Sequence, residues 1–415
     1  MKVNGIIAEY NPFHNGHRYQ LIVSKARTGA DFTIVAMSGN FVQRGAPALL
    51  AKHKRARMAL AGGADLVLEI PFLCATASAE YFANGGVALL DRLGVVTDLC
   101  FGSECDDIRM LGQIADILLR EPEDYLVTLK QYLKQGYSYP SARNWALFQH
   151  YPALEAQREL LTSPNNILAI EYIKALIRRG SQLNPVAIRR KGAGYHDSNL
   201  DRRPEETYCS ALAIRQALYS GSDWDFLKKN MPDTAAAILC EELARKTTIR
   251  SNDFSDILYY KLISGQEEGY EKYLDVSPDL SDRIRKRLNE YSSYESFCDL
   301  LKTKDMTHTR ISRCLLHILL DIKTKDMESA RELDYAPYAR VLGFRKSATP
   351  LLNLIKACSS IPLITKLADA EKQLTPRSFA LLKQDILVSQ LYSGIATRTE
   401  IGIPASEYTI PLVIL

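Results

Sequence analysis

The sequence predicts an α/β protein whose first half is built on a parallel sheet and whose second half is mostly helical. Two observations support this prediction. Short, apolar, β-branched stretches alternate with helical segments from residue 3 to about residue 222, which is the pattern of parallel βαβ units. From about residue 223 onward the strand pattern fades and amphipathic helices dominate, which indicates a separate helical domain. We therefore expect two domains, residues 1–222 and 223–415.

The first predicted strand runs from Val3 to Ala8 and is ended by an Asn-Pro pair, so a loop should follow it. A helix is expected to begin near Asn15 or Gly16. This order places His14 and His17 at the carboxyl end of the strand. Open α/β sheets bind ligands at that edge, and the start of a helix offers free N–H groups and a positive dipole end to phosphate.

The string His14-Asn15-Gly16-His17 suits an anionic phosphate. The glycine lets the backbone approach closely, and two imidazoles can donate hydrogen bonds to the charge that grows on phosphorus during displacement. The alternative is a turn that holds two incidental histidines. A strand before the string and a helix after it favour nucleotide binding.

The alternation continues along the chain. Further strands are predicted at 31–40, 64–72, 97–104 and 186–190, with helices at 49–61, at 78–93, through most of 107–180 and from about 209. Right-handed crossovers place all strand carboxyl ends on one edge, so His14, Asn40, Pro71 and Gly102 should converge there. The tip of the loop 41–47 should lie beside the first loop. For Gly102 an ordinary turn glycine is the alternative.

Later segments add candidate phosphate ligands. Arg189 and Arg190 end a strand, where side chains alternate, so at most one of them should point into a given pocket; a polar loop, 191–203, follows. Ser210, at the start of the next helix, either caps that helix or binds phosphate. Arg215 lies about a turn and a half further on and could flank the same site.

A basic stretch lies in the helical half. Residues 283–313 hold eight Lys and Arg against four Asp and Glu, with Tyr and Phe between them. Arg283, Arg287, Arg310 and Arg313 are candidates for contact with RNA. A solvated helix face is the alternative.

Length and composition limit the remaining possibilities. A chain of 415 residues, 47% of them hydrophobic, is long enough for two or three compact units. The net charge of +4 is mild, so any surface for nucleic acid should be a local patch. Eight scattered cysteines without a CxxC pair or zinc spacing predict buried thiols and no metal site. Apolar runs are too short to span a membrane and no leader is evident, so we expect a soluble, cytoplasmic protein.

Several strings together resemble one known family. GIIAEYNPFHNGH, MSGNFVQRGAPA, ADLVLEIPF, FGSE, SPNNILAIEY and IRRKGAGYHD are similar to strings of the bacterial tRNA(Met) cytidine acetate ligases. These enzymes belong to the HIGH-type nucleotidyltransferase superfamily, with pantetheine-phosphate adenylyltransferase and the class I aminoacyl-tRNA synthetases. The resemblance therefore implies a Rossmann-like domain of that type.

The resemblance also implies a reaction and a site. ATP and acetate would give acetyl-adenylate, and the acetyl group would pass to the exocyclic amine of the wobble cytidine of elongator tRNA(Met), with Mg²⁺ accompanying the nucleotide. His14 and His17 would be catalytic. The superfamily's second signature falls on 209–215 and is poorer in hydroxyls than usual, which weakens its implied phosphate contacts. The implied ATP-binding residues are Ile7, Ala8, Glu9, Tyr10, Asn11, Pro12, Phe13, His14, Asn15, Gly16, His17, Arg18, Tyr19, Gln20, Gly102, Asn166, Arg189, Arg190, Ser210 and Arg215.

Two other functions fit parts of the sequence. A small-molecule adenylyltransferase, of the pantetheine-phosphate or nicotinamide mononucleotide type, would use the same motif but would not need the long basic helical half. An RNA-binding protein with a decayed nucleotide site would not be expected to keep His14, Gly16 and His17 together.

Overall fold

The structure is a computed structural model, and it describes residues 1–137, 139–191, 208–221, 224–398 and 404–415. The predicted loop 191–203 lies outside the described residues except for Lys191. The predicted domain boundary at 222/223 also lies outside them, and it stays a prediction.

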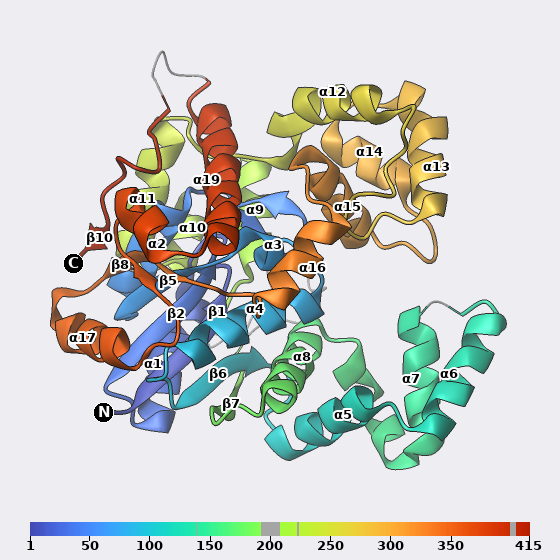
Figure 1. Cartoon of the computed structure of the whole chain (residues 1–415), viewed down its shortest axis with the longest axis horizontal. Coiled ribbons are helices and arrows are strands. Elements are labelled where there is room, and N and C mark those ends of the chain that lie inside the picture. Colours follow the sequence, from blue (N-terminus) through green and yellow to red (C-terminus); the bar gives the residue numbers. More distant parts are fainter. Residues whose placement is uncertain (138, 192–207, 222–223, 399–403) are drawn as a thin grey trace.

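A central sheet organises the chain (Figure 1). Its strands lie in the order β10, β8, β5, β2, β1, β6, β7, with β9 beside β8. The strands β1 (Val3–Ala8), β2 (Phe32–Ser38), β5 (Leu66–Ile70), β6 (Asp98–Ser103) and β7 (Asn184–Arg189) are mutually parallel. Their carboxyl ends therefore meet at one edge, as the alternation predicts.

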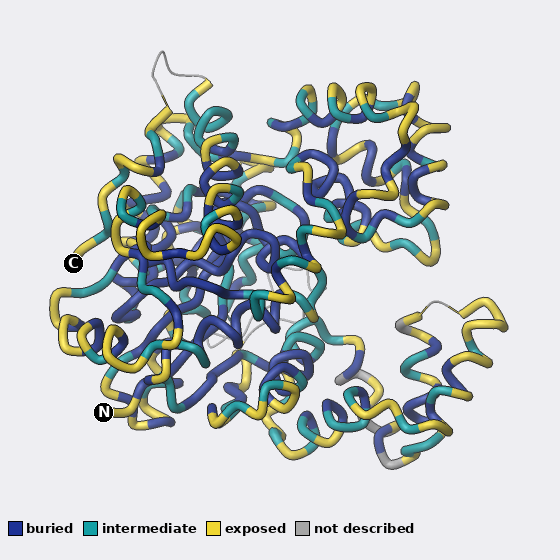
Figure 2. The backbone as a smooth tube through the Cα atoms, viewed as in Figure 1, coloured by how far each residue is buried: buried dark blue, intermediate teal, exposed yellow. Residues whose placement is uncertain are grey.

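Helices cover both faces of the sheet because each central strand is apolar on both sides. Ile6, on β1, packs with the helices α1 (Asn15–Thr28) and α2 (Lys52–Gly62), whereas its neighbour Ile7 packs with α4 (Ala79–Arg92) and α8 (Pro164–Arg179). Adjacent residues of a strand point to opposite faces, so a continuous apolar run fills both layers. Figure 2 shows the sheet as the most buried part of the tube.

Two helical groups extend from this core (Figure 1). The arm, residues 108–161, is inserted between β6 and α8. The C-terminal lobe, residues 255–319, packs around Leu258, Phe297 and Leu315, and this buried cluster continues into Phe41, Phe72 and Leu382 of the central part. The arm consists of α5 (Ile108–Arg120), α6 (Glu123–Lys134), α7 (Tyr139–His150) and the 3₁₀ segment η1 (Pro152–Leu161); the lobe consists of α12 (Ser255–Gly265), α13 (Pro278–Arg287), η3 (Leu288–Glu290), α14 (Tyr294–Leu301) and α15 (His308–Leu319).

The remaining helices connect these parts. They are α3 (Phe72–Ala75), α9 (Ala211–Tyr219), α10 (Trp224–Asn230), α11 (Asp233–Ala244), η2 (Ser251–Phe254), α16 (Thr324–Glu332), η4 (Lys346–Ala348), α17 (Thr349–Cys358), η5 (Leu367–Asp369), α18 (Ala370–Gln373) and α19 (Pro376–Ala396). Among the described residues, no helix combines the length and the apolar character needed to cross a membrane.

The second half is less purely helical than its sequence pattern indicates. It supplies β8 (Ala339–Phe344), β9 (Leu363–Ile364) and β10 (Val413–Ile414), and β8 pairs antiparallel with β5. A buried ion cluster holds this pairing: Glu69 on β5 lies 2.8 Å from Lys52 and 2.9 Å from Arg340, and Arg340 also pairs with Glu407. Because β8 is short and buried, it has no polar alternation that would mark it as a strand in the sequence.

A second difference concerns the loop 41–47, which folds as a hairpin of β3 (Phe41–Val42) and β4 (Ala46–Pro47). Its tip lies beside the first loop, as expected, because the Gln43 N–H donates to Glu9 Oε1 at 2.9 Å.

Candidate active site

A cavity of about 330 Å³ opens at the carboxyl edge of the sheet. The ends of β1 and β6 form its floor, and the starts of α1, α8 and α9 form its wall. A volume of this size falls in the range of small-molecule sites. The edge at which the sequence places a ligand therefore does carry a cavity.

The two histidines of the first loop lie together in this cavity. His14 is the N-cap of α1, and its Nδ1 accepts a hydrogen bond from the Gly16 N–H at 3.0 Å. His17 Nδ1 accepts from the His14 backbone N–H at 3.3 Å, and the ring centroids are 3.7 Å apart. Because both Nδ1 atoms act as acceptors, the hydrogen-bond pattern assigns the ring proton of each imidazole to Nε2.

Burial keeps both imidazoles neutral. It lowers the pKa of His14 to about 3, with further lowering by the charges of Arg190 and Arg215. Burial, then His14 and Arg190, lower the pKa of His17 well below its ordinary value. Each ring therefore offers one Nε2–H donor at neutral pH without a charge of its own.

Arginines and helix starts surround the pair. Arg190 and Arg215 both line the cavity, and Arg215 Nη1 donates to the Asn11 carbonyl at 2.5 Å. Ser210 also lines it; its Oγ accepts from the Ala213 N–H at 3.1 Å and so caps α9, while the hydroxyl proton remains available as a donor. These groups, with the starts of α1 and α9, form a cationic end that suits phosphate.

A buried arginine holds the backbone of the first loop in place. Arg55, on α2, is fully buried and donates to the carbonyls of Glu9 at 2.6 Å, Leu50 at 2.9 Å and Ser38 at 3.1 Å, and also to that of Gly39. Four backbone carbonyls, from the ends of β1 and β2 and from the segment before α2, thus share one guanidinium. Sequence reasoning did not single out Arg55, because a lone arginine in a basic helix gives no sign that it is buried.

Close packing fixes the loop further. Phe13 is buried against Gly62, where an added Cβ would lie 2.3 Å from the Phe13 ring, so only glycine fits. Asn11 Oδ1 accepts from the Leu49 N–H at 2.8 Å. The residues between strand and helix therefore hold a rigid path that presents the histidines.

A second, narrower cavity of about 30 Å³ adjoins the first at the histidines. It shares His14, His17, Gly102 and Arg190 with the first cavity and adds Tyr19, Ile188 and Tyr208. The rings of Tyr19 and Tyr208 are 5.5 Å apart, and an added Cβ on Gly16 would lie 3.4 Å from Tyr208. A planar base could enter here only if the two tyrosines part.

The structure brings most of the predicted site residues together. Ile7, Ala8, Glu9, Tyr10, Asn11, His14, His17, Gln20, Gly102, Arg190, Ser210 and Arg215 line the wide cavity, and Gly16, Tyr19 and Arg189 line the narrow one. Arg190 lines both cavities and Arg189 the narrow one, so both arginines reach the narrow cavity, where strand alternation predicted at most one of them. The reason is that β7 ends at Arg189, and Arg190 lies beyond the strand in which side chains alternate. Their assigned contacts with ATP stay predictions.

Five residues predicted to bind ATP line neither cavity. Pro12 and Phe13 are buried, Arg18 is exposed, and Asn15 Nδ2 donates to the Lys229 carbonyl at 3.0 Å. Asn166 is buried, and its Oδ1 accepts from Ser103 Oγ at 2.6 Å and from the N–H groups of residues 104 and 105. It joins the end of β6 to the start of α8, while no hydrogen-bond partner of its Nδ2 is found among the described residues.

Sequence reasoning missed several cavity residues. Gln43 and Arg44 reach the cavity from the β3–β4 hairpin, and Phe82, Phe101 and Tyr172 form an apolar wall. Arg44 could have been predicted as a cavity residue, because the tip of the loop 41–47 was expected beside the first loop. The aromatic residues sit in apolar runs that give no sign of which side chain faces a ligand.

The four predicted RNA-contacting arginines lie on two helices of the C-terminal lobe. Arg283 and Arg287 belong to α13, and Arg310 and Arg313 belong to α15. Arg287 and Arg310 are exposed, and Arg287 pairs with Glu290 at 2.8 Å. Arg283 and Arg313 are half-buried. His317 follows Arg310 and Arg313 along α15 and is fully buried. Its ring nitrogens contact the Leu274 and Thr76 carbonyls at 2.8 and 3.0 Å, so His317 supports the packing of the lobe.

Fold and site together define a nucleotidyltransferase of the HIGH type. Its marks are a parallel sheet, a histidine pair at the start of the first helix, and arginines from later strands and helices around one phosphate-sized space. A family model described as HIGH Nucleotidyl Transferase matches residues 1–402.

Individual relatives narrow this class. Proteins named tRNA(Met) cytidine acetate ligase from Acetivibrio thermocellus and Clostridium kluyveri are 41% and 42% identical, over 94% and 95% of both chains. Two crystal structures of Thermotoga maritima TmcAL, one apo and one bound with alpha-thio ATP, superpose with TM-scores of 0.93 and 0.91 at 32% and 31% identity, over 100% of both chains. The chain therefore belongs to the tRNA(Met) cytidine acetate ligase family of HIGH nucleotidyltransferases.

Proposed function

We propose that this protein joins acetate to the exocyclic amine of the wobble cytidine of elongator tRNA(Met), with ATP as the source of energy. The observation that carries the proposal is the pair of neutral Nε2–H imidazoles beside two arginines in one cavity. The names of the relatives, at 41–42% identity, support the choice of substrate.

The first half-reaction is the formation of acetyl-adenylate. An acetate oxygen attacks the α-phosphorus of ATP, the bond to the bridging oxygen breaks, and pyrophosphate leaves. The Nε2–H groups of His14 and His17 stabilise the charge that develops on the α-phosphoryl oxygens, while Arg190 and Arg215 hold the leaving group. No covalent protein intermediate is needed.

The residues present fit ATP. Neutral imidazole donors, two guanidinium groups and two helix starts are the groups that a polyphosphate requires. Mg²⁺ would accompany the nucleotide, held mainly by the phosphates and by water, and would neutralise charge on the leaving group.

The second half-reaction transfers the acetyl group to RNA. The cytidine amine attacks the acetyl carbonyl, and AMP leaves. Because the anhydride is already activated, positioning supplies much of the remaining acceleration. The C-terminal lobe, with Arg283, Arg287 and Arg310 on neighbouring helices, would hold the tRNA by its phosphates. A tRNA substrate places the reaction in the cytoplasm.

The test is acetate-dependent exchange of labelled pyrophosphate into ATP, together with mass spectrometry of nucleosides from tRNA treated with ATP and labelled acetate. We expect exchange that requires acetate and not coenzyme A, and labelled N4-acetylcytidine in the RNA. A product that needs acetyl-coenzyme A and releases no AMP would contradict the proposal. A requirement for a phosphorylated small molecule would favour a small-molecule adenylyltransferase.

A further inference from the structure

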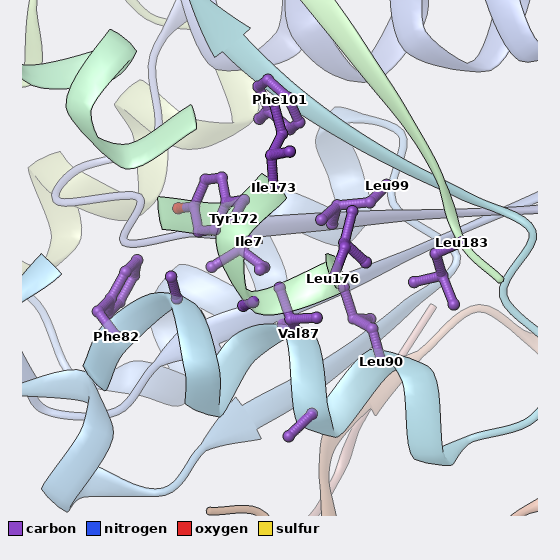
Figure 3. Close-up of a cluster of buried hydrophobic side chains, with 14 of the residues drawn as sticks. Ile7, Phe82, Val87, Leu90, Leu99, Phe101, Tyr172, Ile173, Leu176 and Leu183 are labelled. Carbon is purple, nitrogen blue, oxygen red and sulfur yellow. The ribbon is translucent and has the colours of Figure 1, made fainter. Parts of the chain in front are cut away.

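The wide cavity has two chemically different ends. The cationic end holds the histidine pair, Arg190 and Arg215. The apolar end is built from Ile7 on β1, Phe82 on α4, Phe101 on β6 and Tyr172 on α8. Figure 3 shows these four side chains within one buried cluster, and the rings of Phe101 and Tyr172 are 5.7 Å apart. Flat aromatic walls suit a flat ligand, and they offer nothing to a phosphate.

Glu9 lies between the two ends. Among the described residues that line the cavity, it contributes the only carboxylate. Its Oε1 accepts from the Gln43 N–H at 2.9 Å, and its Oε2 accepts no hydrogen bond from a described residue. Burial raises the pKa of Tyr172 and the charge of Glu9 raises it further; that charge also counters the lowering of the Arg215 pKa by burial. The carboxylate therefore shares one cavity with Tyr172 and Arg215.

A carboxylate in this position does not suit the triphosphate of ATP, because like charges repel. It does suit an amine, and carboxylates pair with the N4 amine of cytosine in nucleic-acid recognition. The narrow cavity, with Gly16, Tyr19 and Tyr208, would become a separate place for adenine if the two tyrosines part.

We infer that the apolar end receives the cytosine base of the RNA substrate, extruded from its stack, and that Glu9 accepts the N4 amine and then its proton. The inference rests on the proposed function and assigns the second half-reaction to a named residue. Extruded bases are commonly bound between aromatic and apolar side chains with their polar edge hydrogen-bonded.

The step balances without another reactant. The N4 lone pair forms the bond to the acetyl carbon, and the carbon–oxygen bond to AMP breaks with its electron pair on the phosphate. The nitrogen becomes strongly acidic as it is acylated, so Glu9 can take its proton and release it to water afterwards. AMP and the neutral acetylated amine remain.

The test separates the two half-reactions in Glu9→Gln, which keeps the acceptor for the Gln43 N–H but removes the charge. Acetyl transfer from adenylate formed on the enzyme to tRNA(Met) should slow by about 100-fold or more, and by about tenfold more than pyrophosphate exchange does. Glu80→Gln is the control, because Glu80 is an exposed carboxylate paired with Arg178 outside the cavity.

A second variant tests the location of the base. Ala79 is half-buried at the rim of the apolar end, so Ala79→Phe should fill this end without rebuilding the core. We expect it to abolish transfer and to spare exchange. An increase of about tenfold in the KM for ATP would instead place adenine there and overturn the inference. Equal loss of both half-reactions in Glu9→Gln, or no loss in either, would also overturn it. Absence of acetate-dependent exchange in the wild type would overturn the proposed function itself.

Discussion

His14 and His17 fix one another: the backbone N–H of His14 donates to Nδ1 of His17 at 3.3 Å, and the two rings lie 3.7 Å apart between centroids. The pair therefore works as one donor unit, and the orientation of His17 depends on the loop conformation at His14. His14 also has a structural role, because its Nδ1 caps the amino end of α1.

The first prediction follows from these two roles. His17→Ala should keep the fold and lower the turnover of adenylate formation by about 100-fold or more, because one donor to the α-phosphoryl group is removed. His14→Ala should show the same decrease in turnover and also destabilise the protein by about 1 kcal/mol, because the N-cap is removed. Turnover is measured by pyrophosphate exchange and stability by chemical denaturation.

His14→Asn is the matched control for the cap. Asparagine is a strong N-cap residue but has no Nε2–H, so stability should be retained while turnover stays low. Near wild-type turnover with a raised KM for ATP in His17→Ala would mean that the ring binds only the ground state of the nucleotide.

The second prediction concerns pH. The pKa of His14 is lowered to about 3 and that of His17 lies well below its ordinary value, so both rings are neutral in the free enzyme at and above pH 6. We expect kcat/KM for ATP in the exchange reaction to show no ionisation near the ordinary histidine pKa of about 6.5. A decline below pH 6.5 that disappears in His17→Gln would show that protonation of this ring controls the step.

The third prediction concerns RNA binding. Reversing charge at the exposed Arg287 and Arg310, together with Arg283, should weaken tRNA binding. The slope of log affinity against log salt should become shallower by about one unit for each phosphate that is no longer neutralised. Exchange should be unaffected, since adenylation needs no RNA. Filter binding at several salt concentrations measures the effect. Arg377→Glu, an exposed arginine of α19 outside the lobe, is the control. Unchanged tRNA binding would make the basic stretch a solvated helix face.

The fourth prediction concerns Gly45, which couples the lobe to the cavity. Gly45 has a positive φ of 74°, its carbonyl accepts from Ser312 Oγ at 2.8 Å, and an added Cβ would lie 2.3 Å from the Arg313 nitrogen. Gly45→Ala should displace the hairpin that carries Arg44 and lower both half-reactions. Gly112→Ala, at an open helical position, should have no effect. Normal exchange in Gly45→Ala would show that the hairpin does not shape the ATP site.

The fifth prediction concerns acid stability. Burial alone would raise the pKa of Glu407, but Lys52, His53 and Arg340 outweigh it and lower that pKa. A carboxylate with a lowered pKa stabilises the fold above its unfolded pKa of about 4.3, and this contribution is lost as pH falls below that value. Glu407→Gln should therefore lower the free energy of unfolding at pH 7 by about 3 kcal/mol. The free energy of unfolding of the variant should also fall less steeply as the pH is lowered. Denaturant titration at each pH measures both effects. If the stability of the variant falls in acid as steeply as that of the wild type, other carboxylates cause the decline.

The sequence determined the site to the extent that the site is local. Strand, loop and helix follow one another within residues 3–28. The apolar run, the Asn-Pro pair and the glycine therefore predict that His14 and His17 lie at the end of a strand. The alternation of strands and helices predicts that the strands are parallel.

Only the tertiary structure decided which distant side chains complete the cavity. Arg55 looks like a surface residue of a basic helix, yet four carbonyls surround it because α2 packs under the loop. Asn166 joins β6 to α8 through its Oδ1, a role that the sequence did not predict, and its contact with ATP stays a prediction. Strand β8 was missed because its place beside β5 depends on buried charges from residues 52, 69, 340 and 407. Local patterns encode periodicity and turns, whereas burial of a charge depends on partners far away in the chain.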